Sequence, residues 1–212
     1  MTIYTLSGQE RATRKALFER LFTLRHDVFV KTRNWTLPTR AKMEFDEYDV
    51  PEAQYFFGVD DTDTIVSHVR LTPTTTHSLM ADYFPHLVEP VHTPRGAATY
   101  EATRYIVPPN TRSVSAYKKA KAELLLAMLE WCRDNGVAHV QAVIDAGAFN
   151  HYLEASPETE PLGLSSPYGG GPLVPGGGEA IAVRCPVTAN ERRRSAPACG
   201  ERGIVMRDGG EV

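Results

Sequence analysis

The chain has 212 residues, of which 42% are hydrophobic and 23% charged, and this composition is that of an ordinary soluble globular protein. A net charge of −3 gives no positive field that would attract nucleic acid. No apolar run of about 18 residues is present to span a membrane, and the polar N-terminus lacks the apolar core of a signal peptide. We therefore expect a cytoplasmic protein without nucleic-acid or membrane partners.

The cysteine and histidine patterns do not indicate a metal site. The three cysteines are an odd number at wide spacing, and they fit neither a disulfide framework nor a zinc motif. The histidines of the proline-rich segment from 73 to 94 also match no zinc spacing. We expect unreactive thiols, no bound metal and no permanently bound cofactor.

A short alternating strand opens the chain, and a helix is predicted from about residue 10 to residue 30. On a helical wheel, one continuous arc of this helix is apolar. Its members are Leu17, Phe18, Leu21, Phe22, Leu24, Val28 and Phe29. Arg25 falls in the middle of this arc, where an unpaired guanidinium is energetically costly. Two interpretations fit: Arg25 pairs with a carboxylate of the protein or a ligand, or its head reaches solvent past the core.

The segment MEFDEYD brings four acids, Glu44, Asp46, Glu47 and Asp49, into a predicted loop bounded by prolines. A run of acids is most often a solvated loop. Here the acids are also candidate partners for isolated arginines of predicted helices and strands, since buried charges must be paired. Those arginines are Arg25, Arg70 and Arg104. A single network joining the first helix, the acidic loop and two strands is the simplest arrangement.

The middle of the chain predicts a hairpin, an irregular excursion and then a further strand. The hairpin turns at DDTDT, and Arg70 lies near the end of its second strand. The strand after the excursion contains YEATR, with Glu101 and Arg104 three residues apart. In a regular strand these two side chains serve opposite faces, whereas a β-bulge brings both to one face.

The C-terminal half predicts a helix over about residues 115–135, closed by Gly136, followed by a buried strand, a short helix, a glycine-rich loop and a last strand. Residues 189–212 show no periodicity and are expected to form a flexible tail. The elements favour a single α/β or α+β domain over residues 1–188, with a mixed sheet.

Several of these motifs, in this order, resemble the acyl-homoserine-lactone synthases, the LuxI-type autoinducer synthases of quorum-sensing bacteria. The resemblance covers residues 1–187 and rests on LRHDVFV, NW, EFDEYD, HVRLTPT and YEATRYIV. The residues that match the family pattern are Arg25, Phe29, Trp35, Asp46, Asp49, Arg70, Glu101 and Arg104, with Glu44 and Phe84 at nearby positions.

The resemblance implies a fold like that of the GCN5-related N-acetyltransferases, a twisted mixed sheet flanked by helices. A cleft between two splayed central strands would receive the acyl chain and its pantetheine arm. The residues VPPNTRSVSAYKKAK lack the glycine-rich pyrophosphate loop of those enzymes. Three lysines follow in the predicted helix, Lys118, Lys119 and Lys121. They contact CoA phosphates or an acidic carrier protein in one interpretation, and they form a solvated helix face in the other.

The implied reaction acylates the amine of S-adenosylmethionine from an acyl thioester, on CoA or acyl-carrier protein. The methionyl carboxylate then closes the lactone and releases methylthioadenosine. The amine must be neutral to attack, so a carboxylate base is required. Glu101 is the first candidate and Glu44 the second. Backbone N–H groups at the expected bulge would stabilise the oxyanion.

The remaining implied roles concern binding and positioning. Arg25, Phe29, Trp35 and Arg104 would bind S-adenosylmethionine, with the sulfonium on aromatic faces and either arginine at the carboxylate. Trp35 could equally anchor its loop as a core residue. Asp46, Asp49 and Arg70 would fix the network, and the acyl pocket would include Phe84, Thr103 and Val143. The resemblance favours a short, branched or aryl acyl group on CoA, and a monomer or weak dimer.

Two other functions remain open on the sequence. A generic CoA-dependent N-acyltransferase of the same fold would acylate a different amine, and a non-catalytic domain would bind a small cationic ligand without turnover. The absent glycine-rich loop and the Arg, Trp and Asp-x-x-Asp pattern favour the synthase over both.

Overall fold

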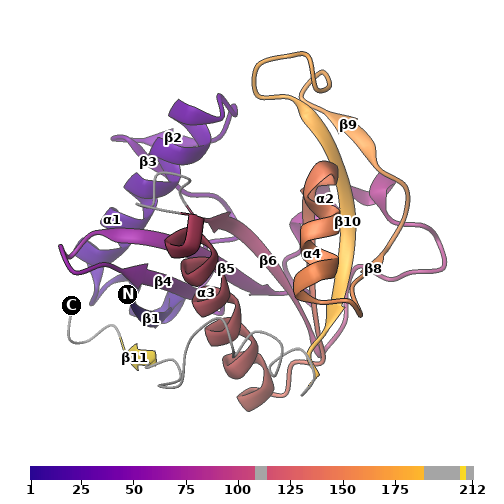
Figure 1. The fold of residues 1–212 in the computed structure, drawn as a ribbon. Coiled ribbons are helices and arrows are strands. Elements are labelled where there is room, and N and C mark those ends of the chain that lie inside the picture. The colour runs from indigo at the N-terminus through magenta and orange to yellow at the C-terminus, as the bar shows by residue number, and fades with distance from the viewer. Residues whose placement is uncertain (108–113, 189–205, 209–212) are drawn as a thin grey trace.

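The computed structural model describes residues 1–107, 114–188 and 206–208. Its centre is a nine-stranded mixed sheet with the order β11-β1-β4-β5-β6-β7-β10-β8, in which β9 also pairs with β10 (Figure 1). The strands are β1 (Thr2–Ser7), β4 (Gln54–Val59), β5 (Ile65–Pro73), β6 (Thr99–Ile106), β7 (His139–Asp145), β8 (Glu160–Pro161), β9 (Ser166–Tyr168), β10 (Gly178–Pro186) and β11 (Met206–Asp208). The α-helices are α1 (Lys15–Arg25), α2 (Leu79–Tyr83), α3 (Val114–Asp134) and α4 (Phe149–Ala155). This arrangement confirms the predicted α/β class.

The helix predicted over residues 10–30 is divided into three segments. A 3-10 turn at Gly8–Arg11 begins with a capping box, in which Ser7 and Glu10 satisfy each other's backbone N–H groups. The α-helix starts only at Lys15, and from His26 to Thr32 the chain continues as a π-helix. Apolar periodicity alone could not place these boundaries, because capping and the hydrogen-bond pattern of the backbone determine them.

Three segments predicted as irregular contain strands. The acidic loop holds a two-stranded hairpin of β2 (Thr39–Arg40) and β3 (Met43–Glu44), and the glycine-rich loop holds β9. The expected tail contributes β11, which pairs parallel with β1. The other residues of that tail, 189–205 and 209–212, lie outside the described part of the chain. Strands of two or three residues carry too little pattern to be recognised in a sequence.

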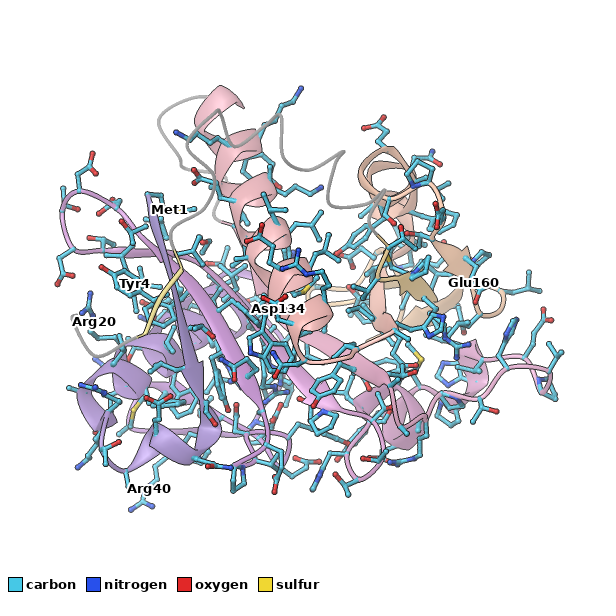
Figure 2. The ribbon with its side chains drawn as sticks, turned by 90° about the horizontal axis from the view of Figure 1, so that it is seen from below. Met1, Tyr4, Arg20, Arg40, Asp134 and Glu160 are labelled. Atoms are coloured by element: carbon cyan, nitrogen blue, oxygen red, sulfur yellow. The ribbon has the colours of Figure 1, made fainter. Side chains whose placement is uncertain are left out.

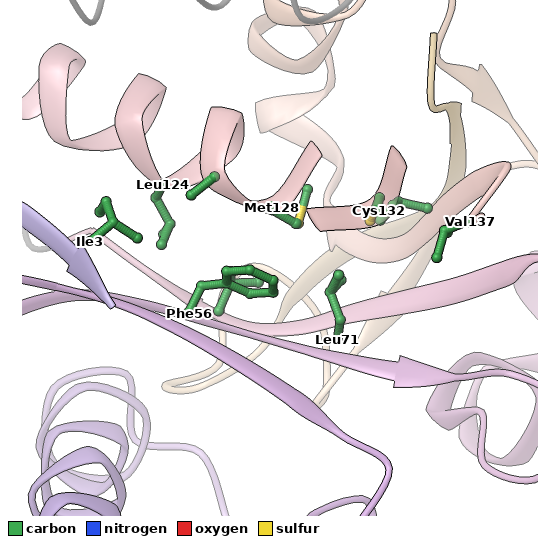
Figure 3. Packing of buried hydrophobic residues seen from close by; sticks show 10 residues of the cluster. Ile3, Phe56, Leu71, Leu124, Met128, Cys132 and Val137 are labelled. Atoms are coloured by element: carbon green, nitrogen blue, oxygen red, sulfur yellow. The ribbon is translucent and has the colours of Figure 1, made fainter. Parts of the chain in front are cut away.

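Two hydrophobic cores cover opposite faces of the first part of the sheet. Leu124, Met128 and Cys132 of α3 pack on Ile3, Phe56 and Leu71, as Figure 3 shows. On the other face, Leu17, Phe18 and Leu21 of α1 pack on strand residues that include Tyr55 and Phe57. Because alternate residues of β4 serve the two cores, this strand is almost completely buried. The predicted close of α3 is confirmed, since Gly136 has a φ of 69° and donates its N–H to Arg133.

The sheet divides between β6 and β7. These parallel strands pair only at Thr99–His139, Tyr100–Val140 and Glu101–Gln141, although they contain eight and seven residues. Beyond this point β6 stays with β5, and β7 stays with β10. Figure 1 shows the sheet opening between β6 and the half that contains β10. A third core, formed by Met80, Leu87, Leu162, Ala180 and Ala182, packs beside the β7–β10 half. None of the helices in the described ranges combines the length and apolar character needed to cross a membrane.

Candidate active site

Arg25 is completely buried at the C-terminal end of α1, and its guanidinium is hydrogen-bonded to carboxylates. Its Nε donates to Glu44 Oε2 at 2.6 Å, and its two terminal nitrogens donate to Asp49 at 2.7 and 3.0 Å. This geometry confirms the pairing interpretation and excludes the one in which the head of Arg25 reaches solvent. Arg25 has no exposed surface, and these bonds join α1 to the acidic segment.

Arg70 and Arg104 complete the network from the neighbouring strands. Arg70 donates to Asp46 at 2.5 and 3.2 Å and lies 2.8 Å from Asp49, while Arg104 donates to Glu44 and Asp46, each at 2.8 Å. The three arginines and three carboxylates balance in charge. Glu44 and Asp49 are fully buried, whereas the Arg104 side chain keeps 8% of its surface exposed.

The surrounding charges keep this network ionised. Burial raises the pKa of Glu44 and of Asp49, but their arginine partners outweigh it and hold both pKa values below the usual range. Because these folded-state values lie below the unfolded ones, the carboxylates stabilise the fold above their unfolded pKa of about 4. That contribution is lost as the pH falls through the folded-state values.

A β-bulge places Arg104 in this network. His68 of β5 pairs with Ile106 of β6, but Arg70 pairs with Thr103, so β6 contains one extra residue. Arg104 itself has a φ of 55°, a left-handed conformation that is unusual for a residue other than glycine. The bulge turns Arg104 to the face of Arg70 and Thr103, whose hydroxyl accepts from Arg70 Nε at 2.9 Å. Of the two alternatives that the Glu-x-x-Arg spacing left open, the structure has the bulge.

Glu101 lies at the last rung that β6 shares with β7, where the two strands begin to separate. Its carboxylate accepts from Ser78 Oγ at 2.7 Å and from the backbone N–H of Met80 at 2.8 Å. Burial raises the pKa of Glu101 to about 7, against the opposing effects of its hydrogen bonds and of Arg70. Glu101 therefore combines two positions, the base of the split in the sheet and the N-terminal end of α2.

The aromatic residues predicted beside the site form a cluster that connects the two halves of the sheet. Phe29 of the π-helix stacks on Trp35 with ring centroids 5.1 Å apart, and Tyr168 of β9 meets Trp35 edge-on at 6.2 Å. The guanidinium of Arg104 lies 5.5 Å from the Phe29 centroid. Trp35 thus supports its loop and also offers an aromatic surface, so the two interpretations of this residue are compatible.

A polar contact follows the same path as this aromatic cluster. Asp145, at the end of β7, accepts hydrogen bonds from Arg33 at 3.2 Å and from the Tyr168 hydroxyl at 2.6 Å. The segment after the π-helix is therefore tied to the far side of the split in the sheet.

Phe84 and Val143 both pack against the third core, beside the β7–β10 half. Thr103 lies across the split, on β6. Val143 and Thr103 each come two residues after the Glu101–Gln141 rung, on the two strands that diverge from it. Thr103 and Val143 therefore lie on the two strands that diverge, one on each side of the split, and their role in an acyl pocket stays a prediction.

The lysines of α3 differ in their surroundings. Lys119 is exposed and lies 3.8 Å from Glu123, as on a solvated helix face. Lys121 lies over the ring of Tyr152, and burial lowers its pKa. The turn before α3, which lacks the glycine-rich sequence of a pyrophosphate loop, falls in residues 108–113, outside the described part of the chain.

Sequence reasoning missed several residues that surround Glu101 and the aromatic cluster. Ser78 caps α2, and Gln141 donates to Pro94 at 2.7 Å beneath Glu101. Asp145 and Tyr168 were not singled out because their partners are more than 20 residues away. The only local signal was Ser78 before a short apolar helix, which is typical of an N-cap. No group of three metal-ligating side chains occurs among the described residues.

The comparisons with known proteins assign the chain to one family. The sequence model of a family described as "Autoinducer synthase" matches residues 9–159 of this chain. The isovaleryl-homoserine lactone synthase of Bradyrhizobium diazoefficiens is 32% identical over 76% of this chain and 72% of its own length. The chain therefore belongs to the autoinducer synthase family, and it is an acyl-homoserine-lactone synthase, an acyltransferase.

Solved structures agree with this assignment. BjaI, a CoA-dependent acyl-homoserine lactone synthase solved with SAM and isopentyl-CoA, superposes with a TM-score of 0.83 at 28% identity, over 99% of this chain and 93% of that one. A Lactobacillus plantarum protein described as an N-acetyltransferase aligns with a TM-score of 0.55 at 16% identity, over 89% of this chain and 100% of that chain. This second likeness concerns the fold alone, and it confirms the predicted N-acetyltransferase-like fold.

Replacing Arg25 by methionine should destabilise the protein by about 3–5 kcal/mol, because Glu44 and Asp49 would be left buried without their partner. The matched control is Arg20→Met on the same helix. Arg20 is partly exposed beside Asp63, and its loss should cost no more than about 1 kcal/mol. Urea unfolding followed by tryptophan fluorescence measures both changes. Equal losses in the two variants would contradict the importance assigned to the buried network.

Proposed function

We propose that this protein makes an acyl-homoserine lactone from S-adenosylmethionine and a short or branched acyl-CoA. The observation that carries the proposal is the split between β6 and β7, with Glu101 at its base and the acid–arginine network beside it. The likeness to BjaI, whose structure contains SAM and isopentyl-CoA, supports both substrates. The acyl thioester would enter along the split, and S-adenosylmethionine would lie next to the network.

Glu101 is the proposed general base for the acylation step. With a pKa raised to about 7, its carboxylate is a stronger base than an ordinary glutamate and is still largely ionised at slightly alkaline pH. The neutral amine then attacks the thioester carbonyl, and backbone N–H groups at the bulge stabilise the oxyanion. Collapse of the tetrahedral intermediate breaks the C–S bond and releases CoA as the thiol.

Glu44 is the weaker candidate for this base. Its carboxylate is bound by both Arg25 and Arg104, and its lowered pKa makes it a poorer proton acceptor. We assign it to positioning, together with Asp46, Asp49, Arg70 and the fully buried Arg25. In this assignment each acid of the network stays paired with an arginine, whereas Glu101 can gain and lose a proton.

Arg104 is the proposed partner of the substrate carboxylate, since its side chain keeps some exposure whereas Arg25 keeps none. Phe29 and Trp35 offer aromatic surfaces for the sulfonium, which is a soft cation. In the second step, a carboxylate oxygen attacks the γ-carbon and forms the lactone C–O bond. The C–S bond of the sulfonium breaks, and methylthioadenosine leaves with the electron pair.

The acyl group is proposed to be short or branched and to arrive on CoA. Met80, Leu87 and Leu162 are fully buried beside Phe84 and Val143, so these side chains limit the depth available next to the β7–β10 half. The similarity to an isovaleryl-homoserine lactone synthase supports the same choice. We further propose that the enzyme is cytoplasmic, acts as a monomer or weak dimer and does not require acyl-carrier protein.

Glu101→Gln should abolish methylthioadenosine release and leave S-adenosylmethionine binding largely intact, because an amide cannot accept the proton. In the wild type, the rate should fall as the pH is lowered through about 7, where Glu101 becomes protonated. Chromatographic assays of methylthioadenosine and calorimetric titration of S-adenosylmethionine measure these effects.

Ser78→Ala is the matched control for that substitution. It removes the hydrogen bond from Ser78 to Glu101 but keeps the carboxylate, so substantial activity should remain. If Ser78→Ala lost as much activity as Glu101→Gln, Glu101 would act by anchoring α2 and not as the base. Wild-type rates from Glu101→Gln would also remove it from that role.

A panel of acyl donors tests the proposed substrates. With S-adenosylmethionine present, isovaleryl-CoA and butanoyl-CoA should support methylthioadenosine release at higher kcat/KM than dodecanoyl-CoA, and acyl-carrier-protein thioesters of the same groups should be poor donors. Activity only with carrier-bound donors would contradict the CoA assignment. A complete absence of methylthioadenosine with every donor would contradict the proposed synthesis itself.

A further inference from the structure

A cavity of about 500 Å³ lies on the outer side of α1, away from the split in the sheet. It is bordered by the turn before α1, by α1 and by the β2–β3 hairpin. Its lining residues are Arg11, Ala12, Lys15, Phe18, Glu19, Phe22, Arg40, Met43 and Phe45. None of them belongs to the site described above. The volume falls in the range of small-molecule sites, which is roughly 300–1,000 Å³.

The inner wall of this cavity is aromatic. The Phe22 ring lies 5.8 Å from those of both Phe18 and Phe45, measured between ring centroids. The guanidinium of Arg11 lies 5.0 Å from the Phe22 centroid and 5.4 Å from that of Phe45. Phe18 and Phe22 are almost fully buried, whereas Phe45 and Met43 are partly exposed. A planar or aliphatic group could therefore replace solvent against these two partly exposed side chains while its charge stays beside Arg11.

The rim of the cavity carries an excess of positive charge. Lys15 lies 3.8 Å from Glu19, the one acid among the lining residues. Arg11 and Arg40 have no carboxylate within 4 Å in the described part of the chain. Figure 2 shows Arg40 at the edge of the molecule with its side chain extending outwards. Both guanidinium groups therefore keep hydrogen-bonding capacity for an anion.

The cavity shares a wall with the acid–arginine network. Met43 and Phe45 line the cavity, while Glu44, between them, and Asp46 face the arginines. Phe22 takes part on both sides, because the Arg25 guanidinium also lies 5.1 Å from its ring centroid. A molecule bound here would contact the same segment that the network holds, without occupying the substrate cleft.

We propose that this cavity is a second binding site, for a small amphipathic anion that joins a carboxylate to an aromatic or short alkyl group. The carboxylate would pair with Arg11 and Arg40, and the apolar group would lie on Met43 and Phe45. The charge excess favours an anion over a neutral ligand, and the aromatic wall favours an organic anion over phosphate or sulfate.

Calorimetric titration with 2-naphthoate tests the proposal, with 2-naphthalenemethanol as the uncharged analogue. The wild type should bind the carboxylate and bind the alcohol much more weakly. The Arg11→Gln/Arg40→Gln double variant should lose about tenfold or more in affinity, because hydrogen bonds to charged groups are among the stronger ones. Arg133→Gln, an exposed arginine on α3, serves as the control and should bind as the wild type does.

Saturating CoA distinguishes the cavity from the substrate cleft and should leave naphthoate binding unchanged. Circular dichroism of the double variant checks that these exposed substitutions leave the fold intact. Equal affinity in the double variant, equal affinity for the alcohol, displacement by CoA, or no binding by the wild type at millimolar naphthoate would each overturn the proposal.

Discussion

The burial of three arginines requires a matching set of carboxylates, and this requirement organises the N-terminal half of the molecule. Arg25, Arg70 and Arg104 come from a helix and two strands, and their partners all come from the segment between Glu44 and Asp49. Leaving any one of these charges unpaired in the interior would cost several kcal/mol. The acidic segment is therefore held against the sheet by electrostatics, although most of it has no regular secondary structure.

Two departures from regular strand geometry turn this network into a site. The bulge in β6 turns Arg104 towards the acids, and the separation of β6 from β7 opens the sheet immediately after Glu101. Because Glu101 precedes the bulge by only three residues, the base of the cleft and the edge of the network lie on one short strand. This closeness suits a reaction in which one substrate must contact both an acyl thioester and a binding pocket for its charged groups.

Much of this could be predicted from the sequence, and the failures have physical reasons. Arg25 stood out because it interrupts an apolar helical arc, and the spacing of Glu101 and Arg104 indicated the bulge; both are local patterns. The link from Arg33 and Tyr168 to Asp145 depends on the path of the chain and has no local signal. Helix boundaries and strands of two or three residues were missed because capping and pairing partners, not periodicity, determine them. The particular pairing within the network was also undetermined, since several acids were equivalent in sequence terms.

The most direct test of the central claim is a double-mutant cycle on the free energy of unfolding, using Arg25→Met, Asp49→Leu and the double variant. Arg25 and Asp49 are joined by two hydrogen bonds of 2.7 and 3.0 Å within the buried network. If the network constrains the fold as described, each single substitution leaves a buried charge unpaired, and the double variant should be at least about 1 kcal/mol more stable than the sum of the single losses implies. Strict additivity of the two losses would contradict the account.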